Sequence, residues 1–356
     1  YSMKLVFILA AIAIFGLLVT VHELGHFLAA KLCGVRVNEF SIGMGPLIWQ
    51  KEKGDTQYSI RALPIGGYCA MEGEDEDTGA EDSFVQQGFW KKFLILVAGS
   101  FMNFLTGVVI LLCLYAGVTE IYTDEIIGTA PEFTQTGENG FQAGDQIYKV
   151  NGYRTYVQGE AKMFLDYAGD TADIEVVRDG THILLEDLPR STFTSADGST
   201  YTGFGIYVGV GVQEATLAKK LQYTWYTALD FVQLVRFSLV QLFTGGAGLD
   251  DISGPVGIVS SMTQVGSEAE TASDAWSQFF YFAALLAVNL AVMNLLPFPA
   301  LDGGRVFFLL VDAVAMLLVG KKVPERYQIA VNMAGFAILM GFMLLITFQD
   351  VFRLIR

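Results

Sequence analysis

The sequence predicts an α-helical membrane protein with four transmembrane helices, a membrane-associated β-hairpin region and an inserted β-rich domain. Three observations support this fold class. Of the 356 residues, 53% are hydrophobic and only 17% are charged, which is too apolar for an ordinary water-soluble domain. Four apolar runs are each long enough to cross a bilayer. Between the second and third runs, short β-branched stretches alternate with Gly, Asp and Asn turns, which is typical of strands.

We expect seven segments along the chain. In order they are residues 1–34 (first transmembrane helix), 35–90 (hairpin region and acidic loop on the cytoplasmic side), 91–116 (second transmembrane helix), 117–213 (extracytoplasmic β-rich domain), 214–274 (amphipathic helix on the membrane surface, then a flexible linker containing Ser253-Gly254-Pro255), 275–320 (third transmembrane helix) and 321–356 (fourth transmembrane helix and the end of the chain). The acidic loop, residues 72–82, is expected to have no role in chemistry.

The first apolar run, residues 5–32, contains His22-Glu23-Leu24-Gly25-His26. Positions i and i+4 share one face of a helix, so both imidazoles can bind one zinc ion. Glu23 can then accept a proton from a water molecule at the metal. The alternative is a chance pattern with satisfied core histidines, but three unpaired polar groups in hydrocarbon would each cost several kcal/mol. The pattern therefore predicts a zinc site within the membrane.

The segment that follows, residues 35–71, alternates apolar and polar residues around a turn at Lys53-Gly54-Asp55, which indicates β-hairpins. Glycines in it mark places where the backbone of another chain can approach closely. The candidate substrate-contacting residues here are Gly43, Gly45, Gly67 and Tyr68. Two interpretations remain open, namely a sheet edge that pairs with an extended peptide and a plain interfacial loop.

In the β-rich domain, the stretch from Gly140 to Gly152 resembles the turn–strand–turn signature of PDZ domains. PDZ-like domains recognise chain ends or extended segments by strand addition. The alternative is a spacer that only restricts access to the membrane part. His182, the one histidine outside the first apolar run, lies in a predicted strand of this domain and is expected to be structural.

The third apolar run leads into Asn294-Leu295-Leu296-Pro297-Phe298-Pro299-Ala300-Leu301-Asp302, followed by two glycines. Prolines and glycines at membrane depth unwind a helix, and freed backbone is tolerated there only where it lines a cavity. Asp302, at the break itself, is the natural third zinc ligand. An interfacial or helix-pairing role is the alternative for an aspartate in this region, and it suits Asp312 better.

Charge and topology agree with this arrangement. If the first and third helices cross in the same sense, both motifs lie at a similar depth. Most basic residues of the connections then fall on one side, which the positive-inside rule assigns to the cytoplasm, and the acidic β-rich domain falls outside. A formal net charge of −15 argues against nucleic acid as a partner.

These residues together resemble the site-2 protease family, and most closely its RseP-like members (regulator of sigma-E protease type) with one PDZ domain. The resemblance rests on His22-Glu23-Leu24-Gly25-His26, the segment from Asn294 to Gly303, the Gly43-Met44-Gly45 turn and the PDZ-like insert. It implies that His22, His26 and Asp302 bind Zn2+ and that Glu23 is the general base. It also implies that Asn294, Pro297 and Pro299 and the hairpin hold an unwound substrate.

The implied activity is that of an intramembrane zinc metalloprotease in the plasma membrane of a bacterium. Its substrates would be single-span membrane proteins, such as anti-sigma factors or signal-peptide remnants, that another protease has already trimmed outside the membrane. Two alternatives from other classes are a metal-gated transporter and a catalytically silent membrane adaptor with a PDZ-like binding domain. The absence of an evident internal repeat and the Glu within the histidine motif argue against the transporter.

Overall fold

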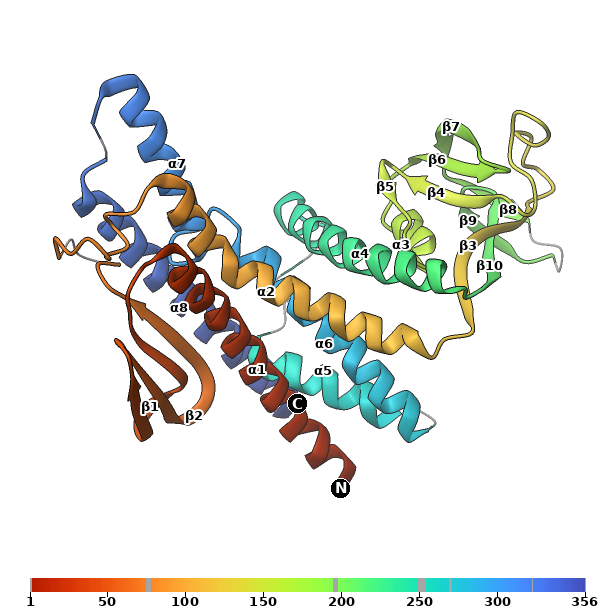
Figure 1. Cartoon of the computed structure of the whole chain (residues 1–356). Helices are drawn as coiled ribbons and strands as arrows, with labels where there is room; N and C mark the ends of the chain where they lie inside the picture. Colours follow the sequence, from red (N-terminus) through yellow and green to blue (C-terminus); the bar gives the residue numbers. More distant parts are fainter. Residues whose placement is uncertain are drawn as a thin grey trace. The chain divides into compact units, whose positions relative to one another are not determined.

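The computed structural model describes residues 2–74, 78–194, 198–246, 248, 254–268, 271–321 and 323–355. Part of the expected acidic loop (residues 75–77) and Ser253 of the expected linker lie outside the described residues. The chain forms two compact units (Figure 1). The first combines Tyr1–Ile110 with Phe237–Arg356, and the second is Leu111–Arg236.

Among the described residues, four helices are long and apolar enough to cross a membrane, as predicted. They are α1 (Ser2–Cys33), α2 (Phe89–Ala116), α6 (Ala272–Asn294) and α8 (Glu325–Ile355). The predicted break follows α6, and a further helix, α7 (Asp302–Val319), starts at Asp302. The coarse fold class, a membrane protein with a β-rich region, is therefore confirmed.

A buried apolar cluster joins the N-terminal half of α1 to α6 and to a helix that the sequence did not predict. Phe7 of α1 lies 5.6 Å, ring centre to ring centre, from Phe279 of α6. The unpredicted helix is α5 (Pro255–Glu268), which contributes Met262 to the cluster. The expectation of a flexible linker is thus wrong for residues 255–268. Pro255 suits a first helical position, and Asp350 of α8 accepts a hydrogen bond from the Gly257 N–H at 2.8 Å.

The predicted hairpin is present as β1 (Val37–Lys53) and β2 (Thr56–Met71), with its turn where expected. The two strands fold over one another, so that residues 39–42 pair with residues 67–70 and also with residues 57–60. Phe40 packs 5.1 Å from Phe27 of α1, ring centre to ring centre, inside a second buried cluster. This packing holds the hairpin beside the C-terminal half of α1 (Figure 1).

The second unit contains a six-stranded sheet in the order β10-β3-β4-β6-β7, with β5 paired to β4. Its elements are β3 (Glu120–Thr129), β4 (Gln146–Val150), β5 (Tyr153–Arg154), α3 (Glu160–Asp166), β6 (Thr171–Arg178), β7 (Thr181–Pro189) and β10 (Ile206–Glu214), with a separate ribbon of β8 (Ser191–Thr194) and β9 (Thr200–Gly203). The strands predicted around residues 147, 174 and 182 are confirmed as β4, β6 and β7. Helix α4 (Leu217–Thr244) follows the sheet and begins in the same unit.

Candidate metal centre

Helix α1 places His22 and His26 one turn apart on a buried face, with their ring centres 4.8 Å from each other. Asp302, the first residue of α7, contributes the third side chain. Its Oδ2 lies 3.0 Å from His22 Nε2 and 3.2 Å from His26 Nε2, and the two Nε2 atoms are 3.1 Å apart. The structure thus brings together three residues that are separated by up to 280 positions in the chain.

These three atoms fit a zinc ion. A tetrahedral zinc with ligands at about 2.0–2.2 Å separates neighbouring ligand atoms by about 3.3–3.5 Å, close to the observed spacing. His26 Nδ1 donates a hydrogen bond to the Ile95 carbonyl at 2.8 Å, so its Nε2 directs a lone pair toward Asp302. A lone pair that faces a carboxylate is repulsive unless a cation lies between them. Two imidazoles and one carboxylate also leave a fourth coordination position open.

Gly99 of α2 closes the other side of the histidine pair, and it was not among the residues predicted for the site. A Cβ atom at this position would lie 2.4 Å from His26 Nε2 and 2.7 Å from His22 Cε1. Gly25 of α1 is equally close to α2, because its Cβ would lie 2.4 Å from the Ala98 carbonyl oxygen. Small residues allow two membrane helices to approach at this distance. The run Ala98-Gly99-Ser100 in an apolar span is the signal that could have indicated this contact.

Glu23 lies between the histidines in sequence and faces the hairpin. A Cβ at Gly67 would lie 3.6 Å from Glu23 Cγ, so the backbone of β2 passes directly beside this carboxylate side chain. In the described part of the hairpin, residues 67–70 pair on one side only, with residues 39–42. A strand with one free edge therefore lies next to Glu23.

The other hairpin residues singled out by sequence have mainly internal contacts. Gly43 has φ +83°, and a Cβ there would lie 2.6 Å from the Leu63 carbonyl oxygen, so this glycine serves the close approach of β1 to β2. Gly45 has φ +84° and lies against the Leu63 side chain. The Tyr68 hydroxyl accepts a hydrogen bond from Arg61 Nη2 at 2.7 Å.

Arg61 also pairs with Glu39 across the hairpin, at 3.0 Å. Burial raises the pKa of Glu39, but hydrogen bonds from Ser59, Tyr68 and Arg61 outweigh it and hold that pKa below its usual range. This network stiffens the hairpin near the strand segment that lies beside Glu23.

The unwound segment after α6 folds back tightly on itself. Asn294 is the last residue of α6, Pro297 is exposed, and Pro299 lies against Gly335 of α8, where a Cβ would be 2.3 Å from the proline ring. The two glycines after Asp302 are required by the same fold. Added Cβ atoms at Gly303 and Gly304 would lie 2.1 Å and 2.3 Å from the carbonyl oxygens of Leu296 and Phe298. This packing fixes the start of α7 and hence the position of Asp302.

One turn beyond Asp302, Arg305 donates a hydrogen bond to Glu74 and forms an ion pair with it. Glu74 also accepts a hydrogen bond from the Met71 N–H at the end of β2, at 3.3 Å. The acidic loop therefore links the hairpin to the helix that carries Asp302. The sequence did not predict this structural role, because pairing across more than 200 residues leaves no local pattern.

Comparison with known proteins agrees with this geometry. The profile of peptidase family M50 matches residues 10–342 of the chain. A protein of Clostridium perfringens is 33% identical over 97% of this chain and 98% of its own length. The zinc metalloprotease RasP of Shouchella clausii is 32% identical over 98% and 99%, respectively. The regulator of sigma-W protease RasP of Bacillus subtilis is 29% identical over 98% of both chains. With two histidines and an aspartate clustered at a candidate membrane helix and a family match over nearly its whole length, the chain belongs to peptidase family M50, the site-2 protease family of zinc metalloproteases.

Proposed function

We propose that this zinc metalloprotease cuts single-span membrane proteins at the depth of its bilayer-embedded site, after another protease has trimmed them outside the membrane. The observation that carries the proposal is the cluster of His22, His26 and Asp302, whose candidate ligand atoms lie 3.0–3.2 Å from one another. Both histidines belong to a candidate membrane span. Polar groups at such a position mark function because hydrocarbon cannot solvate them.

In this mechanism His22, His26 and Asp302 hold the zinc ion, and Glu23 is the general base. When bound, zinc supplies a Lewis acid and an open coordination position. Glu23 accepts a proton from the attacking water and delivers it to the leaving amide nitrogen as the peptide bond breaks. The Ile95 carbonyl fixes the tautomer of His26, and Gly99 leaves room for both rings.

A helical substrate must unwind before attack, because its carbonyl groups are engaged in i to i−4 hydrogen bonds. The free edge of residues 67–70 supports a site where the unwound stretch adds as a strand, with Gly67 beside Glu23 and Tyr68 next in the strand. Asn294 and Pro297, at the unwound segment, would contribute further contacts to the substrate backbone. Gly43, Gly45 and Pro299 contact other parts of the protein, so the role proposed for them is to shape the substrate site.

The β-rich unit is proposed to be a PDZ-like domain on the extracytoplasmic side of a bacterial plasma membrane. The acidic composition of this segment and the basic connections elsewhere support this orientation. Such a domain could exclude untrimmed substrates by size or bind their ends. Substrates of the anti-sigma-factor type are proposed by analogy with the name of the Bacillus subtilis relative.

The test compares cleavage of a tagged single-span reporter by wild-type protein and by Glu23→Gln in membranes, with zinc content measured for each. Glu214→Gln, at the exposed end of β10, is the matched control. We expect Glu23→Gln to keep its zinc and to lose cleavage by about 10²–10⁴-fold, the range for a lost general base. Equal cleavage by both proteins would contradict the role of Glu23. Zinc-loaded wild type that cuts no trimmed reporter would instead favour the silent adaptor.

A further inference from the structure

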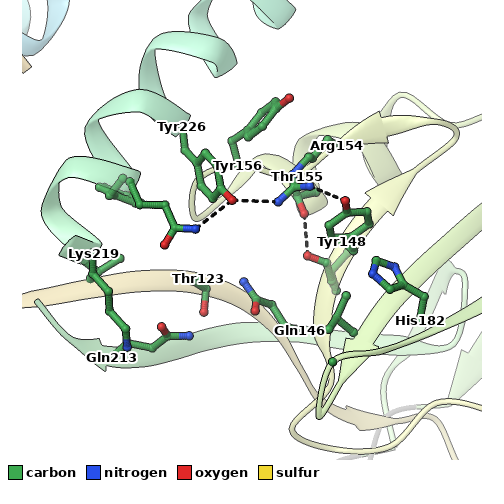
Figure 2. Close-up of a pocket in the computed structure, with 16 residues that line it drawn as sticks. Thr123, Gln146, Tyr148, Arg154, Thr155, Tyr156, His182, Gln213, Lys219 and Tyr226 are labelled. Carbon is green, nitrogen blue, oxygen red and sulfur yellow. Dashed lines mark hydrogen bonds between the residues drawn. The ribbon is translucent and has the colours of Figure 1, made fainter. Parts of the chain in front are cut away.

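The second unit contains a polar pocket of about 300 Å3 between the sheet and the first turns of α4 (Figure 2). Sixteen residues line it, and none is Asp or Glu, although the chain has 37 acidic and 22 basic residues. Arg154, Lys219 and His182 supply basic groups, and the rest are mostly tyrosine, glutamine and threonine. A pocket without carboxylates in so acidic a chain favours an anionic ligand.

Arg154 is held in this pocket by three tyrosines. Its guanidinium lies 4.1 Å from the ring centre of Tyr148, 5.2 Å from that of Tyr226 and 5.3 Å from that of Tyr156. It donates hydrogen bonds to the hydroxyls of Tyr148 and, at 3.3 Å, Tyr226. Its Nε is buried and has no hydrogen-bond partner within the described residues. Among the described residues, no carboxylate forms an ion pair with Arg154. The three tyrosines therefore orient its guanidinium without neutralising its charge.

The two other basic residues of the pocket differ in whether their side chains already pair with a carboxylate. His182 is already engaged, because its Nδ1 lies 2.7 Å from Glu175 on β6. Lys219 extends from the first turns of α4 toward Gln213 at the mouth of the pocket (Figure 2). Arg154 and Lys219 are therefore the two groups available to bind an anion, and they flank the same opening.

The contacts of α4 place this pocket at the end of a membrane span. Within the second unit, Tyr223 packs 5.0 Å, ring centre to ring centre, from Tyr115 in the last turn of α2. Lys220 Nζ donates a 2.8 Å hydrogen bond to the carbonyl of Ala116, where α2 ends. Tyr223 itself lines the pocket. Since α2 is a candidate span, a pocket in contact with its last turn is expected at the level of lipid headgroups.

Helix α4 also carries an exposed apolar stripe, on the face turned away from the pocket-lining residues. Leu217, Leu221 and Trp225 follow one another at intervals of four residues and are 74%, 52% and 49% exposed. Tryptophan and tyrosine concentrate at membrane–water interfaces, where a ring meets both acyl chains and headgroups. The stripe gives α4 an apolar face that suits the bilayer surface, while the face that lines the pocket carries its polar groups.

We propose that this pocket binds the phosphate of a phospholipid headgroup from the leaflet at which α2 ends. Arg154 and Lys219 donate to the phosphate oxygens, since guanidinium and ammonium groups are the usual ligands of phosphate in proteins. The glycerol and upper acyl chains extend from the pocket along Tyr223 and Tyr115, at the last turn of α2. A bound headgroup would hold the first half of α4 at the bilayer surface, independently of catalysis.

The experiment measures binding of dihexanoyl-phosphatidylglycerol to the full-length protein in a phosphate-free, non-ionic detergent, by native mass spectrometry. Arg154→Gln, Lys219→Gln and the double variant are compared with Lys162→Gln, whose lysine is 75% exposed and pairs with Asp166 away from the pocket. Competing ligands are dihexanoylglycerol, inorganic phosphate and a hexapeptide with a free carboxyl end. Circular dichroism checks that each variant is folded, and Lys219→Gln keeps the test valid if Arg154→Gln does not fold.

We expect the double variant to weaken phospholipid binding by about tenfold or more, because each basic group near a membrane surface contributes about a factor of five. Lys162→Gln should bind as wild type does, and dihexanoylglycerol should not compete. Equal binding by all variants, or equal binding of dihexanoylglycerol, would overturn the proposal. Displacement of the lipid by the hexapeptide or by inorganic phosphate at similar concentrations would show a chain-end or free-phosphate site instead.

Discussion

Both units of this protein hold aspartates that are largely buried, but they stabilise them in opposite ways. In the β-rich unit, Asp124 is 4% exposed and accepts two backbone hydrogen bonds at 2.8 Å, from the N–H groups of Gly159 and Ala161. In the membrane unit, Asp302 faces the Nε2 atoms of His22 and His26. The first carboxylate is satisfied by donors of the protein itself. The second converges with two imidazole nitrogens, and the three groups together could hold a metal ion.

This difference distinguishes a buried carboxylate with a structural role from one with a functional role, and it uses the structure of this protein alone. A buried carboxylate needs donors or a cation, since isolated burial of its charge is too costly. Where backbone N–H groups meet this need, the acid anchors a loop, as Asp124 does for the start of α3. Where two imidazole nitrogens and a carboxylate oxygen converge, a zinc ion fits, and the fourth position that three ligands leave open is typical of catalytic sites.

The strongest test of this comparison is the pair Asp302→Asn and Asp124→Asn in the full-length protein. Asp302→Asn should lose most of its zinc, because a neutral amide is a much weaker zinc ligand than a carboxylate, while the protein stays folded. Zinc per protein is measured by atomic emission after purification in detergent. Asp124→Asn is the control and should keep its zinc. Loss of zinc from both variants, or from neither, would remove the distinction between the two aspartates.

Gly99→Ala tests whether the close approach of α2 is part of the metal site. The added methyl would overlap both imidazoles, so we expect zinc affinity to fall by about 10–100-fold. Gly341→Ala is a matched control, because this glycine is also in a membrane helix and a Cβ there meets no atom within 4 Å. Competition for zinc with a chelator of known affinity gives the ratio. Unchanged affinity in Gly99→Ala would mean that α2 can move away at no cost.

Asp124→Asn should also destabilise the β-rich unit. An amide offers one oxygen where two backbone N–H groups now bind, so one donor is left unpaired at a cost of about 1–3 kcal/mol. Hydrogen exchange of amides in β3 and α3, measured by mass spectrometry, reports the local unfolding free energy. Exchange as slow as in wild type would show that water replaces the lost acceptor.

The smallest expected effect concerns Asp230 of α4, which lies against Glu160 and is 2% exposed. Burial, and then the neighbouring Glu160, raise the pKa of Asp230 well above its usual value. A raised pKa means that the folded state holds a proton that the unfolded chain releases. The resulting stability is complete below the ordinary carboxyl pKa and is lost as pH rises toward the folded-state pKa.

Asp230→Asn should therefore change stability least below the ordinary carboxyl pKa and flatten the decline from pH 5 to pH 9. The amide resembles the protonated acid but does not titrate. Hydrogen exchange of α4 and α3, corrected for the intrinsic pH dependence of exchange, gives the slope for both proteins. Parallel slopes would show that Glu160, or another group, carries the proton.

Much of this fold was readable from local patterns, because the bilayer imposes strong constraints on sequence. Each span needs about 20 apolar residues, so all four were found, and the hairpin turn at Lys53-Gly54-Asp55 was found by its turn residues. Helix α5 was missed because Gly, Ser and Pro around it are typical of a linker. Its stability comes from packing of Met262 and from the Asp350 acceptor, which lies 93 residues away from Gly257.

The sequence by itself indicated zinc chemistry, because two histidines and a glutamate at helical spacing are costly to place in an apolar run without a metal ion. It also indicated Asp302, through the prolines that unwind the chain before it. Only the tertiary structure decided that Gly99 encloses the ligands, that Ile95 orients His26 and that the edge of β2 passes Glu23. These contacts join residues that are 44 to 77 positions apart in the chain. No local pattern specifies them, because they depend on how closely helices and strands pack.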